Sequence, residues 1–114
     1  MPSFEKSPPE LVARFEAAAD RHPDATRRKM FGYSALFVGG NLVTGLFADR
    51  WMIRLAPDAL ETLFATPGAG PFSPMAGRTM SGYGVLPPDV VEDDAALDGW
   101  LEQALAFGRT LPPK

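Results

Sequence analysis

One serine stands in a setting that resembles a nucleophilic site. The stretch GYSAL, residues 32–36, begins like the elbow that presents a catalytic serine, but it lacks the second glycine of that elbow. Acyl transfer by Ser34 would also need a base that a carboxylate orients. His22 is the only histidine, and it lies at the predicted end of a helix, where it would face the helix dipole or solvent. The residues therefore do not favour a serine hydrolase, and we expect no enzymatic activity.

Metal and phosphate chemistry have equally few candidate residues. The chain contains no cysteine, which excludes thiolate ligands and cysteine nucleophiles. The acidic run EDD, residues 92–94, lacks the spacing of a calcium loop and fits the start of a helix, where Asp93 or Asp94 can act as the cap. The glycines form no phosphate-binding pattern between a strand and a helix. We expect neither a metal nor a cofactor.

The cations show the most suggestive pattern. Three of them, at residues 27–29, precede Met30 and Phe31, and such a run beside exposed apolar groups can hold an anion or an acidic partner. The more ordinary interpretation of the same run is a solvated connection between a helix and a sheet. Arg54 lies within the apolar stretch WMIRL, residues 51–55, either as a site residue or facing solvent from a sheet edge. The predicted partner-contact residues are Arg28, Lys29, Phe31 and Arg54.

Composition and charge limit the class of protein. The chain has 114 residues, of which 46% are hydrophobic and 22% charged, and we expect residues 1–114 to form one globular domain with no second domain. Its net charge of −3 and isoelectric point near 5.0 argue against a general binder of nucleic acid or membrane surfaces. The first ten residues lack the apolar stretch of a secretory signal, and the longest apolar run, residues 35–38, is far too short to cross a bilayer. We therefore expect a cytoplasmic protein.

A helix followed by a strand meander is expected in the first half of the chain. The helix is predicted to begin at SPPE, residues 7–10, with the Ser7 hydroxyl as its cap, and to end at His22 before Pro23. Short β-prone runs at residues 33–38, 42–47 and 51–55 are separated by turn residues and predict antiparallel strands. The first of these strands is apolar on both faces, so each face needs cover, and a second copy of the chain is one way to provide it.

Two helices and two further strands are expected in the second half. A helix is predicted from Pro57 until TPG, residues 66–68, and the segment 67–78 is predicted to be mostly loop with a short edge strand at 72–75. A strand is predicted over residues 79–86. The last helix is predicted from an apolar stripe at helical spacing, which consists of Leu97, Trp100, Leu101, Ala104, Leu105 and Gly108. The predicted order is α-β-β-β-α-β-β-α, an α+β fold with helices packed on an antiparallel sheet.

Long parts of the sequence resemble a known family. The run RRKMFGYSALFVGGNLVTGLFADRWMIRL, residues 27–55, resembles the amino-terminal domain of the TfoX/Sxy family of bacterial competence regulators. The run MSGYGVLP, residues 80–87, and the terminal helix containing Trp100 also resemble that family's pattern. Family members usually carry two glycines after the phenylalanine that matches Phe31, whereas Tyr33 occupies the second place here. The resemblance covers nearly the whole chain.

The resemblance implies a fold and a kind of role. It implies an α+β domain similar to secretion-chaperone-like folds, a cytoplasmic location and a non-enzymatic function. We therefore expect a small regulatory module, concerned with transcription, that binds a protein partner. Three alternatives stay open: self-association as a homodimer, direct DNA binding, suggested by the cations at residues 27–29, and small-molecule binding in a pocket between the helices and the sheet.

Overall fold

The chain forms four helices and six strands in the computed structural model, which describes residues 6–30, 32–73, 77 and 79–114. The fold class is α+β, as predicted. The elements in chain order are α1 (Pro9–Arg21), β1 (Thr26–Met30), β2 (Tyr33–Val38), β3 (Asn41–Phe47), β4 (Arg50–Arg54), α2 (Pro57–Phe64), β5 (Gly70–Pro71), β6 (Tyr83–Val85), α3 (Pro88–Val91) and α4 (Asp94–Thr110).

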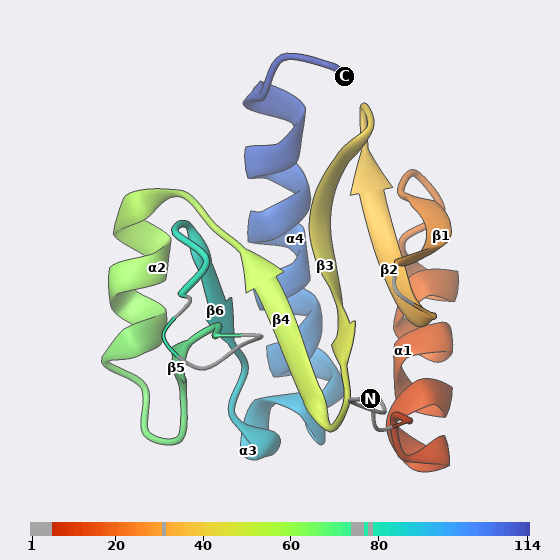
Figure 1. Ribbon diagram of the computed structural model, residues 1–114, viewed down its shortest axis with the longest axis vertical. Coiled ribbons are helices and arrows are strands. Elements are labelled where there is room, and N and C mark those ends of the chain that lie inside the picture. Colours follow the sequence, from red (N-terminus) through yellow and green to blue (C-terminus); the bar gives the residue numbers. More distant parts are fainter. Residues whose placement is uncertain (1–5, 31, 74–76, 78) are drawn as a thin grey trace.

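The strands form one antiparallel sheet in the order β1-β2-β3-β4-β6-β5 (Figure 1). The predicted meander is its centre. Gly39 and Gly40 connect β2 to β3 with φ angles of 58° and 82°, the left-handed conformations that a tight hairpin turn requires. β1 and β5 form the two ends of the sheet.

The element order differs from the predicted one by an added strand and an added helix. β1 was predicted as a connection, because its sequence TRRKM lacks the alternation of a half-buried strand; an edge strand tolerates such charge. α3 is a single turn before α4. The short edge strand lies at Gly70–Pro71 rather than at 72–75, of which residues 74 and 75 lie outside the described part. The strand predicted over 79–86 is confined to Tyr83–Val85, because Gly82 with φ 88° forms a turn before it.

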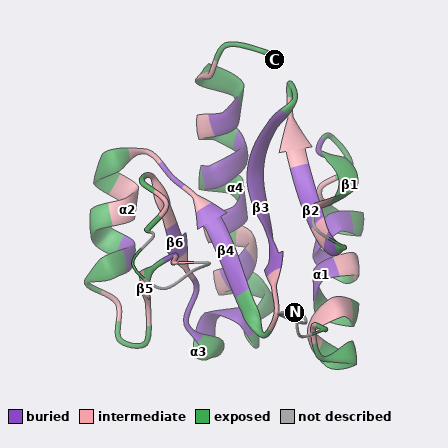
Figure 2. Ribbon diagram, viewed as in Figure 1, coloured by how far each residue is buried: buried purple, intermediate pink, exposed green. Residues whose placement is uncertain are grey.

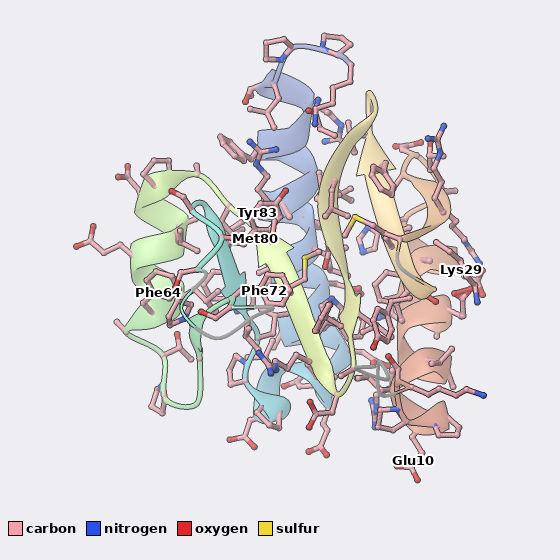
Figure 3. The ribbon with its side chains drawn as sticks, in the orientation of Figure 1. Glu10, Lys29, Phe64, Phe72, Met80 and Tyr83 are labelled. Carbon is pink, nitrogen blue, oxygen red and sulfur yellow. The ribbon has the colours of Figure 1, made fainter. Side chains whose placement is uncertain are left out.

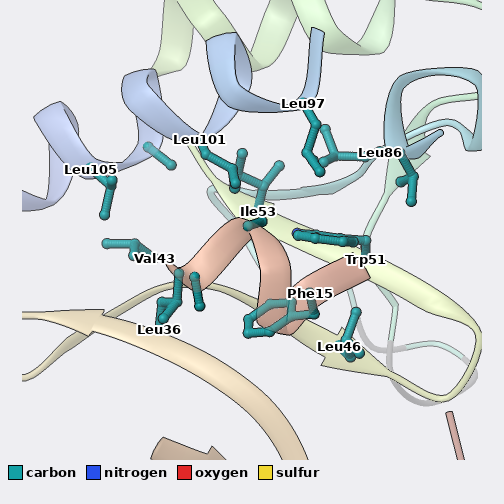
Figure 4. Packing of buried hydrophobic residues seen from close by; sticks show 14 of the residues in the cluster. Phe15, Leu36, Val43, Leu46, Trp51, Ile53, Leu86, Leu97, Leu101 and Leu105 are labelled. Atoms are coloured by element: carbon teal, nitrogen blue, oxygen red, sulfur yellow. The ribbon is translucent and has the colours of Figure 1, made fainter. Parts of the chain in front are cut away.

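All four helices contribute to one buried cluster on one face of the sheet (Figures 2 and 4). Phe15 of α1 packs on Trp51 of β4, with ring centroids 4.9 Å apart, and Leu97 and Leu101 of α4 cover the same region. The apolar stripe predicted in α4 is buried, with Trp100 partly so. This cluster is the main core.

A β-bulge in β3 turns two consecutive side chains toward the helices. Leu36 pairs with Thr44 and Phe37 with Leu42, so Val43 is the extra residue. Val43 packs beneath α4, and Thr44 beside it is also buried. The Thr44 hydroxyl accepts a hydrogen bond from Trp51 Nε1 at 2.8 Å and donates one to the Met52 carbonyl at 2.7 Å. One buried hydroxyl thus satisfies the indole and ties β3 to β4.

The helix ends confirm one predicted cap and contradict another. Asp93 caps α4, and its carboxylate accepts from the backbone N–H groups of Ala95 and Ala96. Ser7 does not cap α1: Pro8 takes the cap position, so Ser7 lies one residue too early and its buried hydroxyl has no hydrogen-bond partner among the described residues.

We predict that Thr44→Val destabilises the fold by about 1–3 kcal/mol, because it leaves the buried Trp51 N–H and Met52 carbonyl without their partner. The free energy of unfolding in urea measures this. The matched control is Thr62→Val. The exposed Thr62 hydroxyl donates to the backbone carbonyl of Asp58 within α2, and its loss should lower the free energy of unfolding by under ~0.5 kcal/mol. Equal losses in the two variants would contradict the assignment.

Candidate functional site

A second, smaller cluster lies on the other face of the sheet, and none of its described members belongs to a helix. Its buried residues are Ala35, Leu42, Met52 and Phe72, and its partly buried surroundings are Met30, Phe37, Phe47, Met80, Tyr83 and Val85. All these residues belong to strands or to the segment between β5 and β6. We call this surface the open face. Figure 3 shows Phe72, Met80 and Tyr83 on it, in front of β4.

Phe72 is buried in the cluster at the centre of the open face. It is 2% exposed and packs edge-on against Phe47, which in turn packs against Tyr33. Hydrogen bonds fix its segment: the Phe72 carbonyl accepts from the Met80 N–H at 2.9 Å, and Arg50 donates to the Ser73 carbonyl at 3.1 Å. The accessible part of the open face is therefore its rim.

Two predicted contact residues, Arg28 and Arg54, lie on this rim. Arg28 pairs with Ala35, whose side chain belongs to the open face, so Arg28 shares that face. Arg54 follows Met52 by two residues and pairs with Tyr83, which places it on the same face. The register thus brings these two arginines to one surface.

Each of the two guanidinium groups lies against aromatic rings. The Arg28 group is 5.8 Å from the centroid of the Phe37 ring, and the Arg54 group is 5.6 Å from Tyr83 and 6.0 Å from Phe107 of α4. These are cation–π distances. Across the part of the chain that the structure describes, neither arginine forms an ion pair with a carboxylate.

The other two predicted contact residues are placed differently. Lys29 pairs with Ser34 on the opposite side of β1. A hollow of about 180 Å³ lies between α1 and the edge of the sheet, and Lys29 borders it together with Glu16 of α1 and with atoms of Arg28. Phe31 lies outside the described residues. The run predicted as one basic patch is therefore divided by the strand: Arg28 faces one way, and Lys29 faces the other.

Arg27, the remaining cation of the run, connects β1 to α1. It forms ion pairs with Glu16 and Asp20 of α1, and the hydrogen bond to Asp20 raises the pKa of the Arg27 guanidinium. Its charge is thus neutralised within the chain, in contrast to those of Arg28 and Lys29.

An ion-pair network joins α1 to α4. Arg21 Nε donates to both carboxylate oxygens of Asp98 at 3.0 and 2.9 Å, and His22 Nε2 lies 3.2 Å from the same carboxylate. His22 lies at the end of α1, as predicted, where it is the C-cap residue. The prediction that it faces solvent is wrong, because its side chain is largely buried against Asp98 of a distant helix. Among the hydrogen bonds of the described residues, none joins His22 to Ser34, and no cluster there could hold a metal ion.

The strands are basic although the chain is acidic. The six strands contain five cations, Arg27, Arg28, Lys29, Arg50 and Arg54, and no carboxylate. The net charge of −3 therefore arises from helices and connections. The sequence contains this excess of cations, but it can be assigned to the sheet only when the bounds of the strands, and of β1 in particular, are known.

A larger cavity lies on another side of the molecule. It measures about 440 Å³ and is bordered by α1, the β3–β4 turn and α3, with Trp51 and Leu86 among its apolar lining. Its charged lining includes Glu10, Arg14 and Arg50. Of the predicted contact residues that the structure describes, Arg28, Lys29 and Arg54, none lines it.

The six-stranded antiparallel sheet with its helices makes this an α+β domain. Residues 14–108 match the family model described as the TfoX N-terminal domain, and the chain belongs to that family. A search of curated proteins and a search of solved structures each found no match. In the described part of the chain, no helix has the length and apolar character that a membrane crossing requires.

We predict that Tyr83 ionises above its ordinary pKa of 10.0, because burial raises the pKa of its hydroxyl while the Arg54 charge opposes the rise. Arg54→Gln removes the opposing charge, so the pKa of Tyr83 should increase further. The Tyr83 contribution to stability is fully present below pH 10.0 and is lost as the pH rises through the folded pKa.

NMR titration of the Tyr83 Cζ resonance measures this pKa in both proteins. A lower pKa in Arg54→Gln than in the parent would contradict the placement of Arg54 beside the ring.

Proposed function

We propose that this member of the TfoX N-terminal domain family is a non-enzymatic cytoplasmic module that regulates by binding another protein. Membership of the family supports a module like that of the competence regulators. The contact residues of the proposal are Arg28 and Arg54 on the open face and Lys29 at the sheet edge, with Phe31 retained from the sequence.

One observation supports this choice above others: among the described residues, Arg28 and Arg54 on the open face have no carboxylate partner, whereas Arg14, Arg21 and Arg27 on the helix side do. Arg14, Arg21 and Arg27 each have carboxylate partners in or beside the helices. Arg28 and Arg54 have rings instead. A ring occupies the flat side of a guanidinium and leaves its in-plane N–H groups as donors. Arg54 directs one of them to the Tyr83 hydroxyl, so that its other donors can bind a carboxylate. The rim is thus suited to an acidic protein surface.

A second candidate function is small-molecule binding. The cavity of about 440 Å³ beside Trp51 is the observation that favours it, since its volume suits a small ligand. A thermal-shift screen with small molecules tests this candidate: a flat response contradicts it, and a ligand whose effect vanishes in Arg14→Ala supports it.

We predict that Arg28→Glu and Arg54→Glu each weaken capture of the native protein partner about tenfold or more, because reversed charges repel its carboxylates. The tagged variants are compared by affinity capture from the native cytoplasm with mass spectrometry. The matched controls are Lys6→Glu and Arg109→Glu, which reverse exposed charges away from the open face and should retain the partner.

Three results would contradict this proposal. The partner could persist in both open-face variants, or be lost equally in the controls. Alternatively, nuclease treatment could abolish capture while a low-salt duplex titration shows binding, which would indicate direct DNA binding. Light scattering of the purified protein in parallel shows whether the partner is a second copy of the chain.

A further inference from the structure

The sheet ends in two unlike edges. β5 has only two residues and contains Pro71, which has no N–H to donate, so this edge is poorly suited to another strand. β1 has five residues without proline, and four of them are exposed. β1 is therefore the edge at which the sheet can be extended.

The outer side of β1 has no backbone partner in the described part of the chain. β1 pairs with β2 alone, through the register from Thr26–Phe37 to Met30–Tyr33. Beyond that pairing, no backbone hydrogen bond between described residues uses residues 26–30. Alternate N–H and C=O groups of an edge strand point away from its neighbour and can pair with another chain.

The charges on β1 determine which strand fits. Arg28 and Lys29 point to opposite faces, and among the described residues neither has a carboxylate within ion-pair distance. Side chains of an added antiparallel strand would stand roughly 4.5–5.5 Å from those directly opposite. Carboxylates at two consecutive positions of that strand would neutralise both cations.

A second copy of the chain fits this edge poorly. Symmetric pairing of two β1 strands is antiparallel, and centring it on Arg28 sets Arg28 against its own copy and Arg27 against Lys29. Like charges directly opposite each other destabilise a sheet. The basic run therefore disfavours self-pairing and favours an acidic segment.

We propose that β1 receives an acidic, extended segment of the partner protein as an added strand, with one carboxylate on Arg28 at the open face and the next on Lys29 at the helix side. The hollow of about 180 Å³ between β1, β2 and α1 can take a side chain of that segment. This inference rests on the proposed function and names the chemistry of the partner.

Two capped synthetic peptides test the proposal. The Glu/Val peptide repeats Glu-Glu-Val-Val, so that carboxylates occupy consecutive positions and reach both faces of the added strand, and the Lys/Val peptide repeats Lys-Lys-Val-Val in the same way. The Glu/Val peptide should slow hydrogen exchange of the outward β1 amides about tenfold in the parent protein, and the Lys/Val peptide should not. In the variant Arg28→Glu with Lys29→Glu the preference should reverse. A misfolded variant would bind neither peptide, so a reversed preference shows an effect of charge. The control is the double variant Lys6→Glu with Arg109→Glu, which changes the net charge by the same amount and should keep the preference of the parent protein.

Protection of β1 that is equal with both peptides, or a variant that still prefers Glu/Val, would overturn the proposal. So would β1 protection that rises with protein concentration alone, which indicates self-pairing. A different result contradicts the proposed function: that neither Arg28→Glu nor Arg54→Glu affects capture of the native partner. If Arg54→Glu abolishes capture while β1 stays unprotected, the proposed function stands and the added strand does not.

Discussion

The packing of every helix on one face of the sheet is the constraint on which the rest of the structure depends. Two glycines allow the close approach. A Cβ on Gly108 of α4 would lie 2.6 Å from Val43 Cγ1, and one on Gly84 of β6 would lie 2.8 Å from Leu63 Cδ2 of α2. The bulge at Val43 adds a side chain to this interface. Because the helices pack on this face, the cluster of the opposite face, with the partly buried residues around it, consists of strand residues together with Phe72 and Met80 from the segment between β5 and β6.

The charges follow the same division. Carboxylates of α1 and α4 bind Arg21, His22 and Arg27, so the helix side neutralises much of its own charge. The strands have cations only, and on the open face these lie against aromatic rings rather than acids. A chain with a net charge of −3 thus presents a basic sheet rim and a basic edge strand. Both the proposed partner surface and the proposed strand addition depend on this separation of charge.

Much of the fold could be predicted from local patterns, because β2 and β3 are β-prone runs between turn residues and α4 has apolar residues at helical spacing. β1 could not, because this exposed strand forms through its pairing with β2 and not through apolar residues of its own. The faces on which the candidate site residues lie also could not be predicted without that strand. Arg28 and Arg54 were identifiable as unusual cations, but their shared face follows from register, as does the separation of Lys29 from Arg28. The link between His22 and Asp98 joins residues 76 positions apart and has no local signal.

The central claim is that the basic strand edge meets carboxylates of a protein partner. Zero-length carbodiimide cross-linking of the captured complex tests it most directly, because this reagent joins a lysine to a carboxylate in contact with it. The chain has three lysines, Lys6, Lys29 and Lys114. The account predicts that mass spectrometry finds the partner's Asp or Glu linked to Lys29. Links confined to Lys6 and Lys114, or between the partner's lysines and the helix carboxylates of this chain, would contradict it.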